Sequence, residues 1–305
     1  FLEYLLSFYS AMQDVRAKSI IYFHFIVVIF GFSSILGALC SLEAIPLVIY
    51  RMVLASLGLA FYFAIFHRSY FKLDSSLWLK VFYGGVIIGL HWVTFFHAIK
   101  VAGVSLTLSM MATGAFITAI IEPLFNKRRV LVYELLFGGL IVLGVSLIFQ
   151  AEYENLYGIS IAMISAFLSS VFTILNSQMV KQGRAITLSF YELLVGAVVG
   201  ISFVLLSGKY SVMDFELKQL DILWILMIAW VCTSYAFNIS IKVMQHLSPF
   251  TVMLIINLEP LYGILLSLAI WGEEELMSFR FYAGFIIILG SILLNGIYKK
   301  QKQII

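Results

Sequence analysis

The stretch Ile45-Pro46-Leu47-Val48-Ile49-Tyr50-Arg51 has a counterpart 141 positions later, Ile186-Thr187-Leu188-Ser189-Phe190-Tyr191-Glu192. Each stretch begins a long apolar segment. The similarity extends outward from this pair, because Gly138 recurs as Gly284 at a similar offset of 146. The chain therefore reads as two related halves, and its architecture depends on what each half contains.

The composition indicates that lipid, not water, surrounds this chain. Of its 305 residues, 62% are hydrophobic and only 11% are charged, and the mean hydropathy is +1.04. Soluble domains are about half apolar and about a quarter charged. A single water-facing globule cannot bury this much apolar surface, so we expect one integral membrane domain.

Apolar segments long enough to cross a bilayer recur along the whole chain. A spanning helix needs about 20 apolar residues, and only helices satisfy their own backbone groups in lipid. We expect ten transmembrane helices, at approximately 19–41, 44–66, 77–99, 102–125, 131–149, 157–180, 186–206, 222–243, 249–271 and 279–298.

Five spans per half is an odd number, so the second half must enter the membrane from the opposite side to the first. The fold we expect is all-α, with two inverted five-helix repeats around a central cavity, an architecture typical of alternating-access transporters. The expected segments are an N-terminal segment 1–18, a first repeat 19–150, an external linker 151–156, a second repeat 157–298 and a basic tail 299–305.

The basic residues orient the chain. With the N-terminus in the cytoplasm, 14 Lys and Arg residues fall in cytoplasmic segments and 4 fall outside, while Arg51 lies inside a span. Cytoplasmic loops carry the excess of positive charge. We therefore expect both termini in the cytoplasm, and a bacterial cytoplasmic (inner) membrane as the location.

Several classes of function have no support in the sequence. The two cysteines, Cys40 and Cys232, lie in apolar segments and have no ligand spacing, so neither a disulfide framework nor a metal site is expected. There is no phosphate-binding loop, zinc-protease motif or nucleophile elbow. The scattered basic residues leave no nucleic-acid footprint. We expect no cofactor, no nucleic acid and no enzyme.

The second and ninth spans carry motifs of a known family. Pro46 to Arg51 followed by Met52-Val53-Leu54-Ala55 resembles the pattern P-x-x-x-x-R-x-x-x-A of EamA-type transporters, a branch of the drug/metabolite transporter superfamily. Ser248-Pro249, Asn257-Leu258-Glu259-Pro260-Leu261 and Gly272-Glu273 resemble its S-P, N-L-E-P-L and G-E string. This resemblance implies two inverted bundles around a cavity, and export of amino acids or related compounds. The chain departs from the family pattern at Gly114, where a proline is usual.

Three ionisable residues at membrane depth are candidates for coupling or for structural roles. Glu259 lies near the middle of the ninth span, where a carboxylate costs about 2.5–3.5 kcal/mol and needs a partner or a watery cavity. Pro260 removes a backbone hydrogen bond beside it, which makes Pro260 and Gly114 candidate helix breaks. Arg51 and Glu192 occupy equivalent places in the two halves. Arg51 could bind a substrate carboxylate or hold helix ends.

The third span carries the candidate wall of the cavity. His91 and Phe95 share one helical face and Trp92 lies beside them, so an aromatic wall with a histidine is expected there. Further substrate-cavity candidates are polar residues of the fourth, eighth and ninth spans: Ser109, Thr113, Tyr235, Asn238 and Asn257. Small hydroxyl residues also simply allow helices to pack closely, and that alternative stays open.

The function that these features favour is secondary transport of small organic metabolites, with export by alternating access. Its partners would be a small-molecule substrate, the lipid bilayer and, as an open alternative to facilitated diffusion, protons. A monomer is expected, with a dimer left open. The alternative carrier is a broad multidrug exporter that binds cations on aromatic rings. Outside the carrier class, we consider a membrane receptor or scaffold, and a lipid-acting enzyme using Glu122.

Overall fold

The computed structural model describes residues 2–127, 129, 132–151 and 153–301. Over these residues the chain consists of helices joined by short loops, with no strand. This agrees with the expectation that apolar segments in lipid form helices. Position 1 of the expected N-terminal segment, position 152 of the linker and positions 302–305 of the tail lie outside the described residues.

The described residues up to 151 form six α-helices and two short 3₁₀ turns, and the first helix already begins within the expected N-terminal segment. In chain order they are α1 (Leu2–Leu39), α2 (Ala44–Phe66), η1 (Arg68–Phe71), η2 (Ser75–Leu77), α3 (Trp78–Ala102), α4 (Val104–Met111), α5 (Thr113–Asn126) and α6 (Val132–Ala151).

The rest of the chain follows the same order of long helices. Its elements are η3 (Tyr153–Asn155), α7 (Leu156–Met179), α8 (Ala185–Ser207), η4 (Val212–Phe215), α9 (Asp221–Met227), η5 (Ile228–Tyr235), α10 (Ala236–Val243), α11 (Pro249–Ile256), α12 (Glu259–Trp271), η6 (Gly272–Glu275) and α13 (Phe279–Gln301). The stretch η5 is π-helical and continues α9 into α10 without a turn.

Eight helical runs of the described chain are long and apolar enough to cross a membrane. They coincide with the first to fourth and the sixth to ninth expected spans. The expected fifth and tenth spans fall on α6 and α13, whose apolar stretches, Leu135–Ala151 and Phe279–Asn295, are shorter. The structure therefore supports a multi-span membrane protein with eight candidate spans and two further apolar helices.

The fourth and ninth expected spans are each interrupted near their middle. The fourth breaks at Ala112, between α4 and α5, two residues before Gly114. The ninth breaks at Asn257 and Leu258, and Pro260 then lies in the first turn of α12, where a missing N–H leaves no bond unmade. The two breaks meet, because Asn257 Nδ2 donates to the carbonyl of Ala112 at 3.0 Å.

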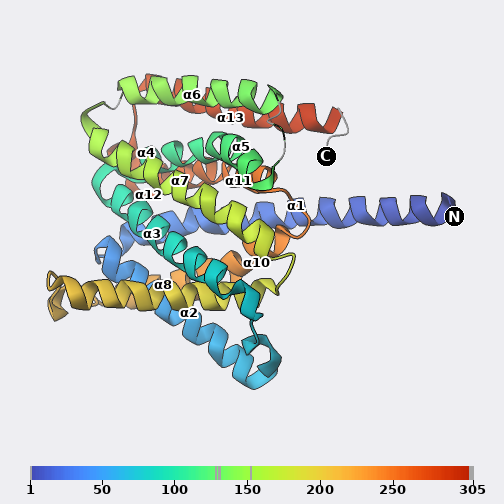
Figure 1. Ribbon diagram of the computed structural model, residues 1–305. Coiled ribbons are helices and arrows are strands. Elements are labelled where there is room, and N and C mark those ends of the chain that lie inside the picture. Colours follow the sequence, from blue (N-terminus) through green and yellow to red (C-terminus); the bar gives the residue numbers. More distant parts are fainter. Residues whose placement is uncertain (1, 128, 130–131, 152, 302–305) are drawn as a thin grey trace.

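Helices from before residue 151 pack mainly on helices from after residue 156. In this exchange α3 packs on α7 and α8, while η5 and α10 pack on α1 and η5 also packs on α2. Other pairs between the two parts include α1 with α12, α2 with α8, α4 with α7 and α12, α5 with α7 and α11, and α6 with α13. The last pair forms one edge of the bundle, at the top of Figure 1.

Two tyrosines reinforce this exchange. Tyr50 of α2 donates its hydroxyl to the carbonyl of Phe215, in the linker that follows α8, at 2.9 Å. Tyr191 of α8 donates to the carbonyl of Phe71, in the linker that follows α2, at 2.7 Å. Tyr50 and Tyr191 are the equivalent residues of the repeated stretch, so the two bonds are counterparts of each other.

Candidate functional site

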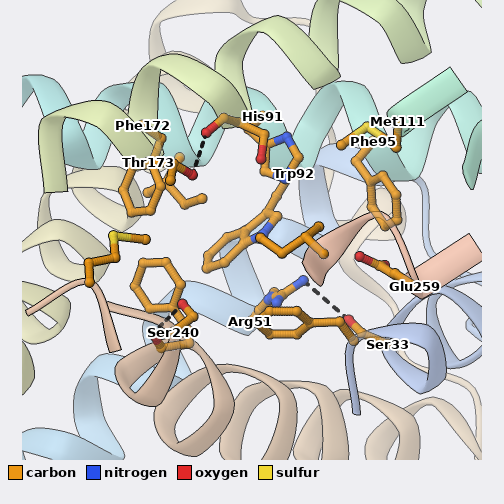
Figure 2. Close-up of a pocket in the computed structure, with 16 residues that line it drawn as sticks. Ser33, Arg51, His91, Trp92, Phe95, Met111, Phe172, Thr173, Ser240 and Glu259 are labelled. Atoms are coloured by element: carbon orange, nitrogen blue, oxygen red, sulfur yellow. Dashed lines mark hydrogen bonds between the residues drawn. The ribbon is translucent and has the colours of Figure 1, made fainter. Parts of the chain in front are cut away.

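A cavity of about 80 Å³ lies at the centre of the bundle. Side chains from α1, α2, α3, α4, α7, α10, α11 and α12 line it, together with Met244 directly after α10 (Figure 2). Both parts of the chain thus contribute to one cavity. We expected walls from the third, fourth, eighth and ninth spans; the structure adds the first, second and sixth.

Arg51 projects from α2 into one side of this cavity, although only 3% of its surface is exposed. Its Nε donates to Thr233 Oγ1 at 2.7 Å, and Nη1 lies 3.5 Å from Ser33 Oγ, a weaker contact. Its guanidinium carbon lies 3.8 Å from the ring centre of Trp92, a cation–π distance. These contacts hold the guanidinium in one place and leave part of its donor fork facing the cavity.

Glu259 reaches the same cavity from the first position of α12. The helix interruption before it places the carboxylate at a helix N-terminus, where negative charge is favourable. The side chain is half-buried and lies on the side of the cavity that also holds Arg51 and Ser33 (Figure 2). In the described part of the chain, no hydrogen bond joins Glu259 to Arg51, so a cation and a carboxylate face one space without being paired to each other.

His91 closes the opposite side of the cavity, where α3 crosses α7. Its Nδ1 lies 3.0 Å from the backbone oxygen of Ser165, and the Ser165 hydroxyl donates to the backbone oxygen of His91 at 3.0 Å. The Ser165 hydroxyl also lies 2.9 Å from Nδ1, so these contacts hold the ring in place from its Nδ1 side.

Aromatic rings cover much of the remaining wall. Trp92 meets Phe237 edge to face, with ring centres 5.3 Å apart, and Phe237 stacks on Phe172 at 5.5 Å. Phe95 and Phe30 complete this surface. The cavity therefore combines charged groups with apolar rings, since Trp92 lies against Arg51 and Phe95 lies beside Glu259 (Figure 2).

The structure brings five of the expected site residues to this cavity: Arg51, His91, Trp92, Phe95 and Glu259. Four others from the fourth and ninth spans serve helix packing. Ser109 and Thr113 bond to backbone oxygens of their own helical run, Asn257 bonds to the opposite interruption, and Gly114 accepts a bond from Ser170.

Tyr235 and Asn238 lie outside the cavity because the eighth span is partly π-helical. Tyr235 is 46% exposed and bonds to the hydroxyl of Tyr22 at 2.5 Å, and Asn238 is not among the lining residues. A π-helical stretch has a wider turn and rotates the following residues relative to an α-helix. The face that reaches the cavity is instead Phe237, Ser240 and Met244.

Several lining residues escaped the sequence reasoning. Ser33 of α1, Ser169 and Thr173 of α7, and Ser240 of α10 add hydroxyl groups to the wall. In the sixth span, Ser165, Ser169 and Thr173 recur every four residues, which places them on one helical face. This row of hydroxyl residues could have identified the sixth span as part of the cavity wall.

The two ends of the bundle differ. At the end where α2 begins, Asp221 accepts bonds from the backbone N–H and the hydroxyl of Ser41, at 2.8 and 2.5 Å, and Lys100 donates to the carbonyl of Cys40. At the end where α2 finishes, an open polar basin of about 600 Å³ enters the protein. Its rim carries three cationic side chains: Lys72, Lys181 and Arg184.

Comparison with known proteins agrees with this arrangement. The sequence model of the EamA-like transporter family matches residues 17–150 and 156–297. A protein of Archaeoglobus fulgidus (strain ATCC 49558 / DSM 4304 / JCM 9628 / NBRC 100126 / VC-16), described as an uncharacterized transporter, is 25% identical over 276 residues, covering 86% of this chain and 90% of that protein. A crystal structure of another protein superposes with a TM-score of 0.67 over 95% of this chain and 98% of that one, at 12% identity, which shows a shared fold. The family match spans nearly the whole sequence, and the chain belongs to the EamA-like transporter family.

Proposed function

We propose that this transporter moves small zwitterionic metabolites, such as amino acids, across a bacterial cytoplasmic membrane by alternating access, and that it exports them. The single observation that carries the proposal is the central cavity, in which Arg51 and Glu259 face the same space without pairing to each other. A substrate with a carboxylate and an ammonium group complements both. The planar fork of arginine suits a carboxylate, and Glu259 suits an ammonium.

The inverted repeat is the second part of the proposal, with ten spans, repeats at 19–150 and 157–298 and both termini in the cytoplasm. Three observations support it. Helices exchange partners between the two parts of the chain, the Tyr50 and Tyr191 bonds are counterparts, and the family model matches in two successive segments. In such carriers, substrate sits at the interface between repeats near the bilayer midplane.

The difference between the two ends supports an inward-facing conformation. Basic residues favour the cytoplasmic side, and three of them border the open basin. The opposite end is closed by the bonds between Asp221 and Ser41. A substrate would enter from the basin and leave where these bonds break.

A broad exporter of cationic drugs is the second candidate. The aromatic wall of Trp92, Phe95, Phe172 and Phe237 favours it, because ring faces attract organic cations. Arg51 argues against it, since a fixed guanidinium in the same small cavity repels a cation.

Flux from preloaded proteoliposomes tests the proposal. The panel consists of amino acids, nucleobases and cationic dyes, each measured for the wild type, for Arg51→Gln, for Glu259→Gln, and for the control Glu216→Gln in an exposed linker. We expect saturable amino-acid efflux that both cavity variants reduce and the control leaves unchanged. Saturable dye efflux that Glu259→Gln abolishes and Arg51→Gln improves would establish the second candidate instead.

A further inference from the structure

A second ionisable group is buried in the bundle, away from the central cavity. Glu192 of α8 is fully buried and does not line the cavity. Its one hydrogen bond in the described part of the chain comes from Asn176 of α7, whose Nδ2 donates to Glu192 Oε1 at 2.8 Å. Asn176 is fully buried as well.

Two oxygen atoms of this pair have no partner among the described residues. They are Glu192 Oε2 and Asn176 Oδ1, and both are buried. An ionised carboxylate in lipid with a single neutral donor is costly, and a buried amide oxygen without a donor adds to that cost.

No charged side chain forms a hydrogen bond to Glu192 in the part of the chain that the structure describes. Charged and titratable residues lie on α7, on α8 and on the elements packed against α8. They are Tyr50, Arg51 and Tyr62 of α2, Arg68 and Tyr70 of η1, Lys80, Tyr83, His91, His97 and Lys100 of α3, Tyr157 of α7, Lys181 and Arg184 between α7 and α8, Tyr191 of α8 and Lys242 of α10. Arg51 and His91 are engaged at the central cavity, and Tyr191 bonds to Phe71.

One proton on Glu192 Oε2 satisfies both orphan oxygens. A protonated carboxyl has one O–H donor, and Asn176 Oδ1 is an acceptor on the side chain already bonded to Oε1. In a closed acid–amide pair, Asn176 Nδ2–H donates to Oε1, as in this structure, and Oε2–H would donate to Oδ1. We propose that Glu192 and Asn176 form a proton-binding site, distinct from the substrate cavity, and that its proton is the coupling ion. The coupling part rests on the proposed transport function.

The basin gives this site a route to water. Val180, which lines the basin, lies four residues beyond Asn176, and Thr187 lies five residues before Glu192. At 1.5 Å of helix rise per residue, the pair lies about 6 to 8 Å beyond the basin floor. Leu188 lies one turn before Glu192 on the same helix and is fully buried.

The site lies in a tight seam between the two parts of the chain. A Cβ atom added at Gly84 of α3 would meet Glu192 Oε1, and one at Gly85 would lie 2.6 Å from the backbone oxygen of Glu192. A neutral carboxyl can remain in such a seam. An ionised one needs water or a donor, so loss of the proton favours separation of α3 from α8, which links protonation to movement of the halves.

Infrared titration of the whole protein in lipid vesicles tests the proton site without any substrate. At neutral pH we expect a carbonyl band from a protonated carboxyl that Glu192→Gln removes and the matched control Glu216→Gln retains. Asn176→Ala keeps the acid but removes its amide partner, so the same band should shift to higher frequency. That second variant also decides the matter if Glu192→Gln does not fold. If neither Glu192→Gln nor Asn176→Ala changes the carbonyl band, the proposed proton site is wrong.

Substrate accumulation against an imposed pH gradient tests the coupling. One proton per substrate sustains at most about tenfold accumulation for each pH unit. We expect accumulation for the wild type and for Glu216→Gln, and a ratio of about one for Glu192→Gln. Accumulation that persists in Glu192→Gln, with the infrared band lost, overturns the coupling role. If no substrate moves in the wild type, the transport proposal fails, while the infrared result still decides the proton site.

Discussion

The start of α2 and the start of α8 are equivalent stretches with one shared role and one divergent role. Tyr50 and Tyr191 both donate to a carbonyl in the linker of the other part of the chain. The next residues differ, because Arg51 lines the central cavity while Glu192 is sealed beside Asn176. The tyrosine contact is thus the same in both stretches, whereas the adjacent charged residue has a different environment in each.

Two acidic residues near opposite ends of the bundle, Asp221 and Asp74, also differ in what they bind. Asp221 joins α9 to the loop before α2 through Ser41. Asp74, before α3, instead accepts from the hydroxyl and the backbone N–H of Ser76, at 2.7 and 2.9 Å, and these bonds hold its pKa below the ordinary value. Asp221 therefore closes one end, while Asp74 caps its own helix at the rim of the basin.

The largest effect is expected from removing the positive charge of Arg51. Truncating one partner of a buried, hydrogen-bonded charge costs about 2–5 kcal/mol, so Arg51→Gln should reduce transport efficiency by about 30-fold or more. Arg51→Lys should fall in between, because an ammonium keeps the charge but lacks the fork that contacts Thr233 and stacks on Trp92. Initial rates of efflux measure both. Equal rates for wild type and Arg51→Gln would remove Arg51 from the site.

A smaller effect should distinguish the two acidic residues. Cys40 is 1% exposed and lies beside Ser41, so its reaction with a membrane-impermeant maleimide reports opening of the closed end. Asp221→Ala removes three accepted bonds and should speed labelling by about tenfold, which corresponds to about 1.4 kcal/mol. Asp74→Ala should leave the rate unchanged.

Both labelling variants belong in a Cys232→Ser background, which leaves Cys40 as the single thiol. Equal acceleration by Asp221→Ala and Asp74→Ala would mean that labelling reports general loosening, and the contrast between the two ends would fail.

The smallest effect is expected from the two tyrosines, Tyr50 of α2 and Tyr191 of α8, and it should be similar for both. Tyr50→Phe and Tyr191→Phe each remove one hydroxyl donor and leave a linker carbonyl, so each should destabilise the protein by about 0.5–1.5 kcal/mol. Thermal unfolding in detergent measures the two shifts. A large shift for one variant alone would show that the two bonds are not counterparts.

Much of the helical plan could be predicted, since apolar length and loop charge are local properties of the chain. Helix phase in the eighth span could not, because the π-helical stretch Ile228–Tyr235 turns Tyr235 outward and Phe237 inward. The interruptions were expected at Gly114 and Pro260, yet they occur two or three residues earlier. A contact between distant helices, from Asn257 to Ala112, joins the two interruptions, and no local pattern encodes it.

That contact has an electrical consequence. Asn257 joins the two interrupted helices at the middle of their length. If the two parts of the chain rotate about this point, the ends of the helices move apart or together. The central cavity then stays at the same depth in the membrane. A neutral zwitterion held there by Arg51 and Glu259 would be unaffected by the membrane potential, whereas an amino acid with a net charge would cross the potential without travelling far, because the voltage drop moves from one barrier to the other around it. The work of about 2.3 kcal/mol per charge per 100 mV would then fall on the opening steps, and voltage would change turnover more than affinity.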